Sequence, residues 1–179
     1  MATASDRYGR FSIVIHWATL ALLVAVYACI ELREIYPRGS EIREALKTWH
    51  YMLGLTVFFL VWVRITARLA GKTPPIVPQT PRWQLMIANA VELALYALMI
   101  VLPLLGWVTL SAERQAIPFF GLQLPALVGA NEILAERTEE VHETLATVGY
   151  FLIGLHALAA LFHHYVRRDN TLRRMTLPR

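Results

Sequence analysis

The sequence is poor in charge and in cysteine. Of its 179 residues, 17% are Asp, Glu, Lys or Arg, whereas 56% are hydrophobic, which is too little charge for a soluble domain of this length. The single cysteine, Cys29, excludes an internal disulfide and leaves the redox state of the compartment open. The composition therefore favours a membrane protein.

Charge is absent altogether from four long windows. They are residues 11–30, 48–63, 93–112 and 144–166. A bilayer core about 30 Å thick is crossed by about 20 apolar residues in a helix, and the first window is too long, and lacks the cleavage pattern, for a signal peptide. We therefore predict an all-α integral membrane protein. Residues 1–179 would form one four-transmembrane-helix bundle, with helices at about 11–31, 47–68, 84–111 and 142–167.

The loops differ in the sign of their charge, and this difference predicts the topology. Basic residues dominate before the first helix, between the second and third, and after the fourth: Arg7, Arg10, Arg64, Arg68, Lys72, Arg82, Arg167, Arg168, Arg173, Arg174 and Arg179. Residues 31–47 are balanced, and residues 113–143 are acidic. Because basic loops stay in the cytoplasm, both termini are expected there. Contact with anionic membrane lipids accounts for the basic face, and nothing indicates a nucleic-acid partner.

Four of the six histidines fall at paired depths in the predicted helices. His142 and His156 are fourteen residues apart, about 21 Å along the axis and about 40° short of four full turns, so they share one face. His16 lies near the cytoplasmic end of its helix, as His156 does, and His50 lies near the outer end, as His142 does. Intramembrane ionisable residues are costly and usually face the bundle interior. The sequence thus predicts one transverse histidine pair in each leaflet.

Two opposed imidazoles are what a bis-histidine haem requires. A zinc site would gather three or four ligands, and the missing Cys-x-x-Cys-His motif excludes covalent haem attachment. Ala146, Gly149 and Ile153 lie between the two histidines on their shared face and, being small or slim, are expected to leave room for a flat group. We predict two non-covalent haems b with His16, His156, His50 and His142 as iron ligands. A single such histidine could instead hydrogen-bond a neighbouring helix.

Several stretches also resemble the prokaryotic cytochrome b561 family. They are VHETLATVGYFLIGLHALAALFHHY (141–165), RRDNTLRRM (167–175), IHW (15–17) and TPPIVP (73–78). The resemblance covers nearly the whole chain and is strongest to the branch that passes electrons from superoxide to ubiquinone. It implies a bacterial inner-membrane oxidoreductase with two haems b and the same axial pairs. Other members serve as cytochrome b subunits of hydrogenases and dehydrogenases.

Three further sites follow from this hypothesis. His163 lies on the same helical face as His156, about 10 Å closer to the cytoplasm. It could bind the quinone or supply its proton, or it could instead contact a haem propionate or lipid headgroups. Arg64, on the face of His50, could pair with a propionate of the inner haem, or else snorkel to the interface. Lys47 and Arg43 could steer anionic superoxide if the second helix begins early, although the outer loops are acidic in sum.

Two rival functions remain at this stage. The chain could be a cytochrome b anchor that takes electrons from a partner dehydrogenase or hydrogenase, so a protein partner is possible but not required. It could also be a small transporter or structural membrane protein whose histidines bind no haem. Glu92, about two turns into the third predicted helix, is the only acid away from the ends of a predicted span, and it is either a proton carrier or an ordinary interfacial residue.

Overall fold

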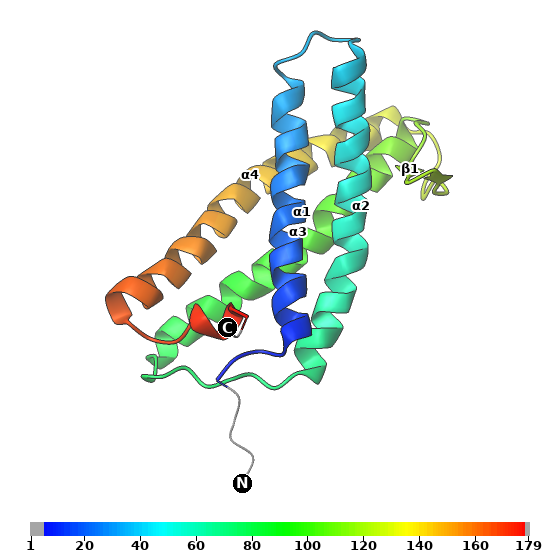
Figure 1. Ribbon diagram of the computed structural model, residues 1–179. Coiled ribbons are helices and arrows are strands. Elements are labelled where there is room, and N and C mark those ends of the chain that lie inside the picture. Colours follow the sequence, from blue (N-terminus) through cyan, green and yellow to red (C-terminus); the bar gives the residue numbers. More distant parts are fainter. Residues whose placement is uncertain (1–5, 178–179) are drawn as a thin grey trace.

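Four long helices dominate the computed structural model, which describes residues 6–177 (Figure 1). They are α1 (Arg10–Arg33), α2 (Glu41–Ala70), α3 (Arg82–Ala112) and α4 (Glu132–Phe162). A π-helical turn, η1 (His163–Arg167), continues α4, and a short 3₁₀ turn, η2 (Arg173–Met175), lies in the tail. All four helices are long and apolar enough to cross a membrane, which confirms the predicted four-helix membrane bundle.

The helices are arranged as two antiparallel hairpins. In Figure 1, α1 and α2 run side by side, and α3 and α4 form a second pair that crosses them obliquely. Packing is most extensive within each hairpin and weaker between α2 and α3. Buried side chains at the α2–α3 contact are Val57, Val61 and Met99. The apolar core is therefore narrow, and much of the space between the two hairpins remains for a ligand.

Two helices begin earlier than their uncharged windows suggest. α2 starts at Glu41 rather than near 47, because the Ser40 side chain accepts a hydrogen bond from the backbone N–H of Arg43. α4 starts at Glu132 rather than near 142, because the Asn131 side chain accepts from the N–H of Leu134. Loss of charge marks where a helix enters the membrane, whereas capping marks where the helix begins.

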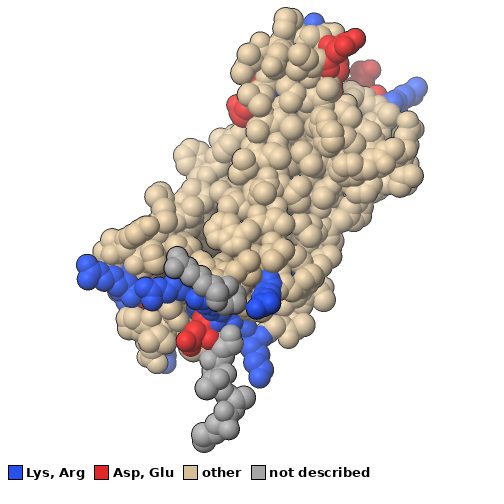
Figure 2. Space-filling model, in the orientation of Figure 1, with Lys and Arg blue, Asp and Glu red and all other residues tan. Residues whose placement is uncertain are grey.

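The surface supports the membrane assignment. Large apolar side chains in the middle of the helices are exposed, among them Val24, Phe151 and Leu158 at 61%, 74% and 66%. Figure 2 shows Lys, Arg, Asp and Glu confined to the two ends of this face, with an uncharged band between them. A soluble monomer rarely exposes so large an apolar area, so this band is the lipid-facing surface.

The loop between α3 and α4 contains a small β-hairpin. Its strands, β1 (Pro118–Phe119) and β2 (Leu122–Gln123), are antiparallel, and Phe120 and Gly121 form the turn with positive φ. Phe119 packs edge to face on Phe59 of α2, with 5.4 Å between ring centroids. The hairpin thus covers the outer half of α2 and closes that side of the bundle.

Candidate functional site

A large cavity lies between the two helical hairpins. Its volume is about 1290 Å³, and all four helices contribute to its lining. Pockets for a single small ligand usually measure about 300–1,000 Å³. His16, His50, His142 and His156 all line it, so the structure brings the four predicted residues to one internal space that is larger than most single-ligand pockets.

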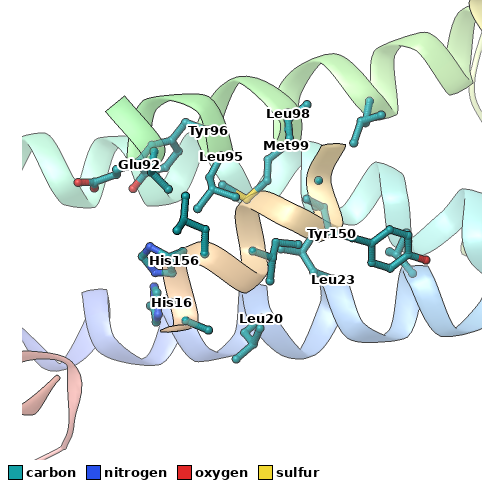
Figure 3. A pocket seen from close by; sticks show the side chains of 18 of the residues that line it. His16, Leu20, Leu23, Glu92, Leu95, Tyr96, Leu98, Met99, Tyr150 and His156 are labelled. Atoms are coloured by element: carbon teal, nitrogen blue, oxygen red, sulfur yellow. The ribbon is translucent and has the colours of Figure 1, made fainter. Parts of the chain in front are cut away.

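The inner histidine pair joins α1 to α4. The rings of His16 and His156 have centroids 6.2 Å apart and are tilted by 52°, and Figure 3 shows them facing one another. The Arg64 guanidinium from α2 lies 2.8 Å from Nδ1 of His16 and 5.3 Å from the centroid of the Tyr96 ring. Arg64 therefore points into the cavity rather than towards the membrane surface.

The outer pair joins α2 to α4. The rings of His50 and His142 also have centroids 6.2 Å apart, at an interplanar angle of 67°. The Nδ1–H of His50 donates to the carbonyl oxygen of Val26 at 3.0 Å, which leaves Nε2 available as a ligand. The ring of His142 packs beside Gly106, where an added Cβ would lie 3.5 Å from its Cε1. Each pair thus takes one histidine from each hairpin.

Both pairs fit a haem iron. A metal–imidazole bond of about 2 Å on each side, plus the distance from each nitrogen to its ring centre, separates two axial rings by roughly 6 Å. The observed separation is 6.2 Å in both layers. Among residues 6–177, no three His, Cys, Asp or Glu side chains gather as a metal-ion site would require. Each pair therefore offers two histidines, as a bis-histidine haem would require, rather than the three or four ligands of a metal-ion site.

Tyr27 of α1 occupies the space between the two pairs. Its hydroxyl donates to the carbonyl oxygen of Ala146 at 2.9 Å and contacts Gly149 so closely that any Cβ there would collide with it. Its ring contacts that of Tyr150, with 4.2 Å between centroids and a tilt of 46°, and the Tyr150 hydroxyl donates to Glu31 at 2.7 Å. The room expected at Ala146 and Gly149 is thus partly filled, and the tyrosine separates the outer layer from the inner one.

The two ends of the cavity carry opposite charge. The outer end is lined by one guanidinium and five carboxylates, Arg33, Glu31, Glu34, Glu113, Glu139 and Glu143. The inner end is lined by three guanidinium groups and one carboxylate, Arg64, Arg68, Arg174 and Glu92. Charges that line a narrow cavity act strongly on groups inside it because the low-dielectric walls focus the field. The inner end is therefore positive and the outer end negative.

Neither Arg43 nor Lys47 lines the cavity, although α2 does begin early enough to include both. Arg43 donates to the Glu34 carboxylate at 3.0 Å and to the carbonyl oxygens of Arg33 and Tyr36. The hydrogen bonds from Arg33 and Arg43 hold the pKa of Glu34 below its usual range. Lys47 pairs with Glu44 at 3.0 Å. Both cations are partly neutralised, so the arrangement does not favour the predicted steering role.

His163 reaches the inner end of the cavity from η1. Its Nδ1 lies 2.5 Å from Oδ2 of Asp169, a carboxylate that is 1% exposed. Glu92 forms an ion pair with Arg68 at 3.3 Å, which favours the structural interpretation of that acid. Sequence reasoning missed Asp169, although it is the only acid in a strongly basic tail, which was the available signal.

Comparison with known proteins identifies related membrane cytochromes. The family model described as prokaryotic cytochrome b561 matches residues 7–178. The chain is 37% identical to "Cytochrome b561 homolog 1" of Escherichia coli (strain K12), over 97% of this chain and 98% of that protein. It is 39% identical to "Probable superoxide oxidase CybB" of Yersinia pestis, over 94% and 95%. It is 31% identical to "Cytochrome b562" of Cereibacter sphaeroides, over 99% of each.

These matches span essentially the whole length of the chain and of its relatives, and they coincide with four transmembrane helices and an internal cavity that contains two opposed histidine pairs. The family match favours haem binding and does not support a role as a transporter or structural protein without haem. The chain belongs to the prokaryotic cytochrome b561 family and is a multi-pass protein of the bacterial inner membrane that binds haem b and transfers electrons.

Proposed function

We propose that the protein binds two haems b and uses them to oxidise superoxide at the periplasmic side and to reduce ubiquinone. His50 and His142 would hold the outer haem, and His16 and His156 the inner one. The observation that carries this proposal is the equal 6.2 Å spacing of the two histidine pairs at opposite ends of one cavity. The balanced reaction is 2 O₂⁻ + Q + 2 H⁺ → 2 O₂ + QH₂.

When bound, haem b supplies reversible one-electron transfer, and a bis-histidine iron leaves no coordination position for an oxygen species. The protein itself contributes by fixing the positions and orientations of the histidines. The two ligands on α4 are separated by fourteen residues, about 21 Å along the helix, which spans most of the membrane core. The Val26 carbonyl fixes the tautomer of His50. Electrons gained one at a time at the outer layer can therefore reach a two-electron acceptor at the inner layer.

Arg64 supports the inner haem in this proposal. Ligation through Nε2 of His16 makes its Nδ1 a proton donor, so the Arg64 guanidinium, now 2.8 Å from Nδ1, needs another acceptor. A haem propionate is the anionic group that the cofactor itself provides, and Arg binds carboxylates in a two-pronged geometry. We assign Arg64 to that propionate.

Quinone reduction is assigned to the inner end of the cavity. Leu20, Leu155 and Leu158 line the cavity and are also exposed on the lipid-facing surface, at 36%, 50% and 66%. An apolar quinone can therefore approach from the bilayer between α1 and α4. His163 lines the same end and, as an imidazole, can hydrogen-bond a quinone oxygen or supply its proton.

Purified protein tests the proposal directly. We expect two haems b per chain by the pyridine haemochrome assay, and formation of ubiquinol when an enzymatic superoxide source is added. Excess superoxide dismutase should abolish ubiquinol formation, because it removes the donor. Haem content near one per chain would refute the two-layer assignment. Ubiquinol formation that is unaffected by the dismutase would refute superoxide as the donor.

The acidic outer end favours a second candidate function. Five carboxylates, against one guanidinium group, line the outer end and repel an anion, whereas they would not oppose electron delivery from a protein. The chain would then be a cytochrome b anchor between a dehydrogenase or hydrogenase and quinone. A stoichiometric iron–sulfur or flavin subunit that copurifies with the chain at native expression levels would favour this function. An isolated chain that reacts rapidly with superoxide would favour the first.

A further inference from the structure

The C-terminal tail folds back over the cytoplasmic end of the cavity. Residues 168–177 follow η1, and Asn170 joins them to the linker between α2 and α3: its side-chain oxygen accepts from the N–H of Val77 at 2.8 Å, and its own N–H donates to the Val77 carbonyl at 3.1 Å. The indole N–H of Trp17 donates to the Met175 carbonyl at 2.8 Å. The tail is therefore fixed at several points beside the inner end.

Asp169 is the one buried carboxylate among the described residues, and its hydrogen-bond partners are close to it in the sequence. Its Oδ1 accepts from the N–H of Thr171 at 2.9 Å, and its Oδ2 lies 2.5 Å from Nδ1 of His163. Burial alone would raise the pKa of Asp169, but the hydrogen bonds from His163 and Thr171 outweigh it and hold the pKa below its usual value. An ionised buried acid is retained only when it is paired, and His163 is its partner.

The backbone at the end of α4 is shaped to make this pair. The π-helical turn over His163–Arg167 is followed by Arg168 in the left-handed region at φ 56°, which ends the helix. The chain then reverses, and the N–H of Asp169 donates to the carbonyl oxygen of His163 at 3.1 Å. A regular α-helix through these residues would carry the carboxylate away along the axis, because residues six apart are about 9 Å apart along it.

An imidazole whose Nδ1 is held by a carboxylate presents Nε2 on its opposite side. The carboxylate selects the tautomer and restrains the ring, as the orienting acid does for a catalytic histidine base. His163 also lines the cavity. We propose that Asp169 is a positioning residue that acts through His163, so that Nε2 faces the cavity and delivers a proton to an oxygen of the quinone being reduced.

This inference rests on the proposed quinone site and specifies how that site obtains its proton. In the step, the Nε2–H bond of the imidazolium breaks and an O–H bond forms on the quinone oxygen, which has received its electrons from the bound haem. The neutral imidazole is then reprotonated from cytoplasmic water. The second proton of the quinol follows by the same route. Asp169 stays ionised throughout and transfers no proton itself.

Stopped-flow mixing of chemically reduced holoprotein with a short-chain ubiquinone tests the inference without using superoxide. Reoxidation of the haem gives a limiting rate and a half-saturating quinone concentration. We expect D169A to lower the limiting rate about 10- to 100-fold, with little change in half-saturation or in the haem spectrum. D169N should fall between D169A and the native protein, because its amide oxygen still accepts from Nδ1 but carries no charge.

Two further variants separate positioning from a general loosening of the tail. The double variant H163Q with D169A should be no slower than H163Q alone, since a residue that acts through another adds nothing once that residue is gone. N170A, which removes the neighbouring contact with Val77, should retain the native rate. Additive losses in the double variant, or a loss in N170A equal to that in D169A, would overturn the inference.

The outcomes also distinguish the positioning role of Asp169 from the proposed quinone site on which it rests. Slow reoxidation in H163Q with native rates in both Asp169 variants would overturn the positioning role and leave the quinone site intact. Native rates in H163Q would instead remove His163 from quinone chemistry, and the role of Asp169 with it. If D169A fails to assemble with haem, D169N supplies the same comparison at nearly constant volume.

Discussion

In the outer half of the cavity His50 and His142 lie among five carboxylates and one guanidinium group, whereas in the inner half His16 and His156 lie among three guanidinium groups and one carboxylate. The histidine geometry is the same in both halves, with 6.2 Å between ring centroids. What differs between the two halves is the electrostatic field of the charged side chains that line them. Positive charge stabilises the reduced state of a nearby redox centre and negative charge destabilises it, so with the two haems that we propose, these surroundings would favour electron flow from the outer layer to the inner one.

The largest effect is expected from removing one ligand of either pair. H142A should lose the outer haem and H156A the inner one, so haem content should fall from about two to about one per chain in each variant. The pyridine haemochrome assay measures the loss, and low-temperature spectra identify the remaining haem. H164A, which changes a histidine outside both pairs, is the control. Retention of two haems in H142A would remove the outer assignment.

The positive inner field predicts a shift in reduction potential. In general, one charge about 10 Å from a redox centre, at an effective dielectric constant of about 20, is worth about 1.7 kcal/mol, or roughly 70 mV for one electron. R64Q should therefore lower the potential of the inner haem by several tens of millivolts and leave the outer potential nearly unchanged. R64K keeps the charge and is the matched control. Potentiometric titration checks this, and equal shifts in both haems would contradict a local origin.

The negative outer field predicts that superoxide oxidation improves when acids are removed. E139Q with E143Q should raise the second-order rate constant for superoxide by about 2- to 5-fold at low ionic strength, with the gain reduced in salt. K47Q should change it little, because Lys47 is paired with Glu44 and lies outside the cavity lining. Stopped-flow kinetics at several salt concentrations measure both. A marked slowing in K47Q would restore the steering role predicted for Lys47.

Substitutions of Tyr27 and Gly149, which lie between the two halves of the cavity, should have the smallest effects. Y27F removes the hydrogen bond to the Ala146 carbonyl and should lower the free energy of unfolding by about 1 kcal/mol. G149A should cost more, since its Cβ would collide with the Tyr27 hydroxyl. G149A combined with Y27F should recover part of that cost, because the colliding oxygen is gone. Thermal unfolding followed by haem absorbance compares the three, and a G149A as stable as the native protein would show that Tyr27 moves freely.

Part of this site could be read from the sequence because its determinants are local. The cost of ionisable residues in a bilayer and the fixed rise of a helix were enough to place His142 and His156 on one face and to match their depths with His50 and His16. The four spans and the orientation followed from uncharged windows and loop charge. The structure then brings each predicted pair together across the two hairpins.

Other features depend on side-chain hydrogen bonds that uncharged windows and loop-charge counts do not register. The uncharged windows did not reveal that Ser40 and Asn131 extend two helices beyond the membrane. Counting loop charges did not reveal that Arg43 is held by Glu34.

The sequence by itself determined the number, direction and depth of the helices and the levels of the four histidines, because these follow from hydrophobicity and helical rise. Only the tertiary structure decided that Tyr27 fills the notch at Gly149, that the cavity is negative at one end and positive at the other, and that Asp169 turns back onto His163. These contacts depend on how the two hairpins cross and where the tail folds, which no local pattern specifies.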